Sequence, residues 1–186
     1  MFRSLMSAAI VAAALTGCAS APTSLILAPD APLITSSVQQ GSLQLTSVDR
    51  RSEQYVVKVR NGDGAAELLS PSQAPRQLLD QGVRKGFSQL GYQLDPASNT
   101  QMTLVLDKAV LEIDQGTFSH DAKGLFEATV KINTKVQTLT KTFTVTSAFS
   151  GPMKPDLARI EREVNDRLSQ LMTNIVNDEE LQQFIR

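Results

Sequence analysis

The stretch FEATVKINTKV, residues 126–136, decides the fold of this chain. Apolar or small side chains alternate along it with charged or polar ones, from Phe126 to Val136. Successive side chains of a β-strand point to opposite faces, so this alternation predicts a strand with one buried face and one wet face. Such strands are typical of antiparallel sheets that meet water on one side.

Two similar stretches flank this strand in the sequence. Residues 142–149 alternate in the same way, and residues 101–113 form a strand pattern whose apolar phase slips by one position near Asp107 and Lys108. A one-residue slip would turn every later side chain to the opposite face, so we expect a β-bulge there. No helical pattern separates the three stretches, which predicts a meander.

An earlier pair of alternating stretches lies within residues 42–61. The segment DRRS, residues 49–52, has the composition of a turn, and a stronger turn signal follows at Asn61–Gly64. We therefore expect residues 42–61 to form a β-hairpin.

Two amphipathic helices complete the pattern. Residues 75–90 begin at Pro75 and end before Gly91, with apolar residues at helical spacing, and Gly82 and Gly86 are small enough for close packing on the sheet. Residues 157–175 repeat apolar side chains at steps of three and four, and Asp178 opens a further short helix. The order β-β-α-β-β-β-α predicts an α+β fold, an antiparallel sheet of about five strands with two main helices on one face.

The first 18 residues have the pattern of a bacterial lipoprotein signal. Arg3 precedes an apolar run from Leu5 to Leu15. This run is shorter than the roughly 20 apolar residues of a membrane-spanning helix. The sequence LTGC, residues 15–18, then places a leucine three positions before the only cysteine of the chain.

This signal predicts where the protein is held. We expect cleavage between Gly17 and Cys18 and attachment of lipid, including palmitate, to the Cys18 thiol. Ala19 follows the cysteine, where an aspartate would favour retention in the inner membrane. The predicted location is therefore the periplasmic face of the outer membrane. An ordinary secretory signal with an unmodified Cys18 thiol is the alternative.

Three regions follow from these patterns. Residues 1–17 are the signal peptide, residues 18–41 are the lipidated cysteine with a tether rich in Pro, Ser and Ala, and residues 42–186 are the periplasmic α+β domain. The apolar patch Leu25–Leu27 interrupts the tether. We favour docking of this patch on the domain, and the alternatives are entry into the bilayer or pairing as a short strand.

Composition and motifs argue against several classes of function. Removal of residues 1–17, which hold one basic residue, changes the formal net charge from −1 to −2, and no basic cluster suggests nucleic-acid binding. His120 is the only histidine, so we expect no metal site and place His120 in a solvated loop. The glycines at Asn61–Gly64 lack the Lys-Ser/Thr of a phosphate loop, and no cofactor is expected.

Two groups of charged residues are candidate sites, and each also has a structural explanation. Asp107, Glu112 and Asp114 offer carboxylates for acid–base cleavage of a glycan. They also fit a bulge, a solvated face and a turn. Asp49 and Arg51 could hold a ligand carboxylate or sugar hydroxyl, or form a turn aspartate with a local ion pair. We expect no catalytic residues and a protein that is not an enzyme.

Several segments together resemble a known family. They are the LTGC sequence ending in Cys18, DRR at residues 49–51, LGY at residues 90–92, the DQG turn at residues 114–116 and the C-terminal pattern from Val164 to Ile185. In their order and spacing they resemble the YajG-type lipoproteins of Gram-negative bacteria. This resemblance implies location and fold and supplies no catalytic or ligand residues.

The wet face of the sheet is the best candidate for a functional surface. Its predicted interaction residues are Thr129, Lys131, Asn133 and Thr144. We expect a non-catalytic role in protein interaction or envelope maintenance, with an envelope protein as partner, and homo-oligomers through an edge strand remain an option. The alternatives are a module that holds a lipid or small apolar ligand beneath Phe87, and a peptidoglycan-acting enzyme.

Overall fold

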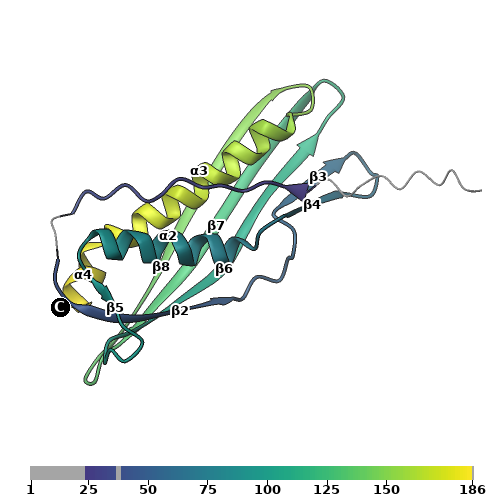
Figure 1. Cartoon of the computed structure of the whole chain (residues 1–186). Helices are drawn as coiled ribbons and strands as arrows, with labels where there is room; N and C mark the ends of the chain where they lie inside the picture. The colour runs from purple at the N-terminus through teal and green to yellow at the C-terminus, as the bar shows by residue number, and fades with distance from the viewer. Residues whose placement is uncertain (1–23, 37–38, 186) are drawn as a thin grey trace, which may run out of the picture.

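Three long strands form the centre of the molecule. The computed structural model describes residues 24–36 and 39–185, so the predicted signal and Cys18 lie outside the described residues. Strands β6 (Gln101–Gln115), β7 (Ser119–Asn133) and β8 (Thr138–Pro152) form an antiparallel meander (Figure 1). Their register shifts between Leu106 and Lys108, which confirms the predicted bulge.

The predicted hairpin over residues 42–61 is wrong. Strands β2 (Ser42–Asp49) and β3 (Val57–Asn61) both run parallel to β6 and lie end to end along one of its edges. The chain leaves this edge after Arg50, whose N–H donates to the Leu106 carbonyl, and rejoins it where the Val56 carbonyl accepts the Leu111 N–H. The segment after Asp49 is therefore a loop between two collinear strands, since its flanking strands share one partner instead of pairing with each other.

Short strands extend the sheet on both sides of this pair. Strand β4 (Glu67–Pro71) pairs antiparallel with β3, β1 (Ser24–Leu25) pairs parallel with β4, and β5 (Gln93–Leu94) pairs parallel with β2. The result is a mixed sheet of eight strands in the described residues. The α+β class is confirmed, but the prediction of a purely antiparallel sheet with about five strands is corrected.

In the part of the chain that the structure describes, three helices lie against the inner face of the sheet. Helices α2 (Pro75–Gln89), α3 (Leu157–Val176) and α4 (Glu179–Ile185) match the predicted helical segments. The carboxylate of Asp156 caps α3 by accepting the Arg159 N–H at 2.7 Å. The two main helices cover the same side of the curved sheet, as predicted (Figure 1). Their apolar faces and the inner side chains of the strands form one core.

The glycines of α2 allow close contact with α3, and not with the sheet as predicted. A Cβ at Gly82 would overlap the side chain of Met172. A Cβ at Gly86 would lie 2.6 Å from Val176 and 2.9 Å from Pro32. The helices therefore approach each other through positions that carry no side chain, which outweighs the low helix propensity of glycine.

An extended segment, residues 24–36, crosses α3 and is called the strap below (Figure 1). Leu25 and Leu27 are buried at 0% and 4% exposure, while Ile26 between them points outward at 69%. The segment that the sequence assigns to a tether is thus packed on the domain from Ser24 to Ser36. The structure shows docking of Leu25–Leu27 on the domain, and Leu25 also pairs as part of a short strand, β1.

Side chains of α3 hold the backbone of the strap. The Ile26 N–H donates to the Glu161 carboxylate at 2.7 Å, and the Ala28 N–H donates to the Asn165 amide oxygen at 2.9 Å. The same pattern returns at the other end of the strap. There the Leu33 N–H donates to Thr173 Oγ1 at 3.2 Å, and the Thr35 N–H donates to Asn177 Oδ1 at 2.8 Å.

The spacing of these bonds follows from two geometries. An extended chain advances about 6.6 Å in two residues, and a helix advances about 6 Å in four. Two strap residues therefore match one four-residue step on a single helix face. Polar side chains four positions apart on α3 can satisfy alternate N–H groups of an extended chain that has no strand beside it there.

Candidate interaction surface

The outer face of β6, β7 and β8, which points away from the helices, is the candidate functional surface. The structure places Thr129, Lys131, Asn133 and Thr144 on it, as alternation predicts. In register, Thr129 faces Thr142, Lys131 faces Thr140, and Asn133 faces Thr138. The four sequence-predicted residues therefore lie together on two adjacent strands.

Three of these four residues are already engaged. Thr129 Oγ1 donates to the Asp107 carboxylate at 2.7 Å. Asn133 Oδ1 accepts from Thr138 at 2.9 Å, and Thr144 Oγ1 donates to Glu127 at 3.2 Å. Lys131 is exposed and has no hydrogen bond or ion pair with any residue that the structure describes. Lys131 is thus the charged group of this set that is available to a partner.

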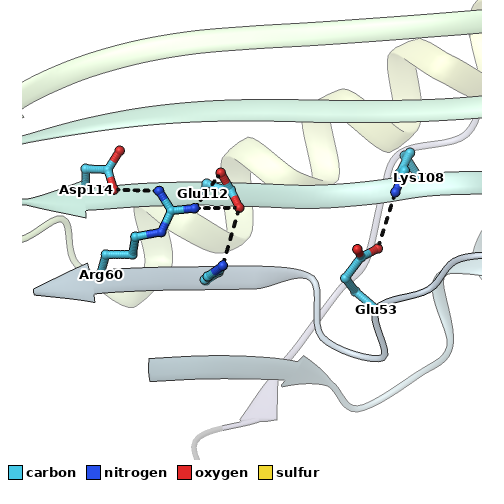
Figure 2. Close-up of polar contacts among 6 residues, drawn as sticks. Glu53, Arg60, Lys108, Glu112 and Asp114 are labelled. Atoms are coloured by element: carbon cyan, nitrogen blue, oxygen red, sulfur yellow. Dashed lines mark hydrogen bonds and ion pairs between the residues drawn. The ribbon is translucent and has the colours of Figure 1, made fainter. Parts of the chain in front are cut away.

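The carboxylates considered for catalysis lie on this open face and are held in ion pairs. Figure 2 shows the Arg60 guanidinium between Glu112 and Asp114, at 3.1 and 3.3 Å. Beside them, Lys108 pairs with Glu53 at 3.7 Å. Cations neutralise both acids of the 112–114 pair, and both side chains are exposed on the surface. This arrangement is that of a surface ion-pair network.

Asp107 is held separately, at the bulge of β6. The Arg50 Nε donates to its carboxylate at 2.8 Å, and Thr129 donates to its other oxygen. Asp107 is thus a structural link between the loop after β2 and the outer face. The described residues include no group of three His, Cys, Asp or Glu placed to hold a metal ion.

Asp49 and Arg51 form the local pair that was the structural alternative. The Arg51 guanidinium donates to both carboxylate oxygens of Asp49, at 3.0 and 2.9 Å, and the Arg51 N–H adds a third bond at 3.1 Å. Burial raises the pKa of Asp49, but these bonds from Arg51 outweigh it and hold the pKa below its usual value. The pair fixes the start of the loop that separates β2 from β3.

The prediction for His120 is wrong. The residue is the second of β7, and its ring lies on the inner face with 1% exposure. Nδ1 lies 2.7 Å from the Met153 carbonyl, which can only accept, so Nδ1 carries the proton. Nε2 is buried without a partner among the described residues, and the ring packs edge-on against Phe149. His120 ties the end of β8 to the start of β7.

The residues considered for an apolar ligand site lie in the core. Phe87, Phe126 and Leu168 are each fully buried at 0% exposure. None of the three lines the hollow of about 840 Å³ beside α4, which is an open surface depression with Lys141, Asn177 and Glu180 in its lining. The structure therefore assigns these three side chains to the packing between the helices and the sheet.

Strand β8 leaves one edge of the sheet open. Among the described residues only β7 pairs with it, over all 15 residues. The side chains of β8 on the outer face carry no charge. They are Thr138, Thr140, Thr142, Thr144, Thr146, Ala148 and Ser150. Natural edge strands are commonly protected by charges, prolines or bulges, and β8 lacks such protection on this face until Pro152.

Comparison with known proteins gives the family. A family model described as "Uncharacterized lipoprotein" matches residues 29–186. The chain belongs to this YajG-type family. The uncharacterized lipoprotein YajG of Escherichia coli K12 is 22% identical over 191 aligned positions, which cover 100% of this chain and 98% of that protein. None of the helices in the described part of the chain is long and apolar enough to cross a membrane.

Two solved structures are similar to this YajG-type chain at low identity. A Xanthomonas campestris protein of the DUF330 family aligns with a TM-score of 0.61 and 15% identity, over 87% of this chain and 97% of its own. The rare lipoprotein B of Shewanella oneidensis aligns with a TM-score of 0.42 and 15% identity, over 73% of this chain and 90% of its own. The first likeness shows the fold alone.

Proposed function

We propose that this lipoprotein is a non-catalytic component of the periplasmic face of the outer membrane, anchored through Cys18, that binds another envelope protein. The partner supplies an extended segment that pairs with the open edge of β8. The observation that carries this proposal is the uncharged outer side of β8, where threonine occupies five alternate positions from Thr138 to Thr146.

Strand addition suits these residues physically. Threonine has high β propensity, and an open edge offers N–H and C=O groups to a partner in extended conformation. Main-chain hydrogen bonds supply affinity in this mode, and side chains on alternate positions supply specificity. Lys131, on the neighbouring strand β7, places a positive charge next to Thr140 and favours a partner segment that carries a carboxylate.

The absence of a rival site in the described residues also supports this proposal. The acids considered for catalysis are held in ion pairs by Arg50 and Arg60, and the core side chains beneath the helices are buried. Membership of a lipoprotein family supports the proposal that this is an anchored envelope protein. A protein held at a membrane with a free strand edge acts most simply by contact.

Crosslinking in intact cells tests this function. A photo-crosslinking amino acid is placed at Thr142, and at Lys85 on the exposed side of α2 as a control. We expect one defined adduct from position 142, of the same mass in repeated experiments, and none from position 85. Loss of specificity, with equal adducts from both positions, would refute the proposal.

Two substitutions at Thr144 show whether β8 itself is the binding edge. Thr144→Lys adds a charge to the strand edge and should reduce the adduct from position 142 several-fold, because edge charges oppose strand addition. Thr144→Val keeps the β-branched shape and should leave the adduct unchanged. An adduct of twice the mass of the chain would assign the edge to a second copy instead of an envelope protein.

A further inference from the structure

Docking of the strap limits how far the domain stands from its anchor. Cys18 precedes Ser24 by six positions, and a fully extended chain spans about 3.5 Å per residue. Six residues of chain reach at most about 21 Å, so a lipid anchor at Cys18 would hold Ser24 within about that distance of the lipid. An undocked tether up to residue 41 would allow about 80 Å. Docking thus brings one end of the domain close to the lipid.

The register of β1 identifies that end. Ser24 pairs with Ser70 in parallel, so the chain enters β1 from the side on which β4 begins. Glu67, the first residue of β4, pairs with Lys154 at 2.9 Å. Three residues of strand cover about 10 Å, so the start of β1 lies on the side of the sheet where β4 contacts the segment that links β8 to α3.

This same end carries exposed apolar side chains. Phe118, in the turn between β6 and β7, is 80% exposed, and Met153, just after β8, is 65% exposed. The two are adjacent, because the Met153 N–H donates to the Phe118 carbonyl at 3.0 Å. An aromatic and a thioether side chain thus form one apolar tip at the end of the molecule from which the anchor extends.

The backbone at Met153 supports a role for its side chain. Its φ of 59° is in the left-handed region, which disfavours residues with a Cβ and suits glycine. His120 Nδ1 donates to the Met153 carbonyl and holds this conformation. A bulky apolar residue therefore occupies a position where glycine would fit the backbone better and would expose nothing, as strained residues at binding sites often do.

We propose that Phe118 and Met153 form a membrane-contacting tip, which inserts into the surface of the lipid bilayer that holds Cys18. The proposal rests on the lipid anchor of the proposed function. The lipid provides attachment, and the tip fixes the orientation of the domain, with the β7–β8 turn at the far end. Strand β7 is 15 residues long, so that turn lies about 45 Å from the tip.

Tryptophan fluorescence can test this contact directly, since the chain contains no tryptophan. Phe118→Trp places one reporter in the tip. Val136→Trp, at an 86% exposed position in the β7–β8 turn, is the matched control. Each lipidated full-length mature protein is reconstituted in vesicles of phosphatidylethanolamine and phosphatidylglycerol, with and without lipids brominated near the headgroup.

We expect brominated lipid to quench the Phe118→Trp protein about twofold and to leave the Val136→Trp protein unchanged, since interfacial side chains reach about 5–10 Å into the headgroup boundary. Equal quenching of both proteins, or of neither, would overturn the tip. Flotation of the vesicles reports the anchor separately. Cys18→Ser should abolish flotation, and a Phe118→Trp protein that floats without being quenched retains the anchor and refutes only the tip.

A substitution at Met153 separates membrane contact from folding. In the Phe118→Trp protein, Met153→Gly relieves the left-handed backbone and removes the apolar side chain. The melting temperature should stay the same or rise, while quenching of the tryptophan in the tip should fall. If Met153→Gly leaves the quenching unchanged, Met153 does not take part in the membrane contact.

Discussion

The strap and β8 are both extended segments at the periphery of one domain, and their free backbone groups are treated in opposite ways. Side chains of α3, at Glu161, Asn165 and Thr173, and of Asn177 at its C-terminal end accept N–H groups of the strap one after another. Strand β8 has its inner side chains packed, but one of its main-chain edges pairs with no strand of the described residues. The fold therefore provides hydrogen-bond partners for the backbone of the strap and leaves the backbone groups at the edge of β8 available for a partner.

Removal of a buried side chain from the strap should have the largest effect on this comparison. Leu25→Ala deletes a fully buried leucine and should lower the free energy of unfolding by about 2–5 kcal/mol. Ile26→Ala, at the exposed neighbouring position, should change it by less than about 0.5 kcal/mol. Urea denaturation measures both. Equal effects of the two substitutions would mean that the strap is not packed in solution.

Loss of one hydrogen-bonding side chain at the end of α3 should have an intermediate effect. Asn177 accepts the Thr35 N–H and donates to the Leu33 carbonyl at 2.6 Å. Asn177→Ala leaves both strap groups without these partners and should cost about 1–3 kcal/mol. Amide exchange of Thr35 should accelerate, while that of Ile26 at the other end should not.

The exposed Asn174, one turn of α3 earlier, supplies the control for Asn177. No hydrogen bond joins the Asn174 side chain to the described residues, so Asn174→Ala should leave both stability and exchange at Thr35 unchanged. If Asn177→Ala behaves like Asn174→Ala, water replaces the bonds of the strap without loss.

The smallest expected effect concerns the inner side of β8. Lys141 pairs with Asp178 at 2.8 Å and with Glu180 at 2.7 Å. Hydrogen bonds to Asp178 and then to Glu180 favour the charged amine and raise the pKa of Lys141 above its ordinary value of 10.5. Because the folded pKa is the higher one, the stabilisation is full below pH 10.5 and is lost as the pH rises through the folded value.

Melting temperatures across this alkaline range measure the contribution of Lys141. Lys141→Met should give a lower melting temperature near neutral pH, and its curve should approach that of the wild type at alkaline pH. Lys131→Met removes a lysine without an ion pair in the described residues, and its curve should remain parallel to the wild type. Parallel curves for both variants would show that Lys141 contributes nothing through its charge.

Alternation predicted which side chains share a face, but it could not predict strand direction. Because every second residue of a strand points to the same face, alternation alone predicts the outer positions of Thr129, Lys131, Asn133 and Thr144. The same alternation, continued backward along β7, places His120 on the buried face with Phe126. It could therefore have corrected the prediction that His120 lies in a solvated loop. Parallel and antiparallel neighbours impose the same alternation, and the collinear arrangement of β2 and β3 therefore stays invisible in the sequence.

The sequence predicted docking for Leu25–Leu27 alone, and the full length of the strap and the tip were missed for different physical reasons. A segment rich in proline and alanine has the composition of a tether, and the polar residues that receive it resemble any solvated helix face. The four-residue spacing of polar residues from Glu161 to Asn177 indicates a binding site for an extended segment only when that segment is already known. Phe118 and Met153 are isolated apolar residues in the sequence, and the fold alone brings them together.

The strap also sets an order of events during synthesis. The side chains of α3 and Asn177 that accept its N–H groups lie 135 to 142 residues later in the chain. In a chain that emerges with its N-terminus first, the start of the strap can pair with β4 early, but its bonds to α3 cannot form until that helix has followed. Most of the strap therefore docks near the end of translation, as one of the last parts of the fold to form.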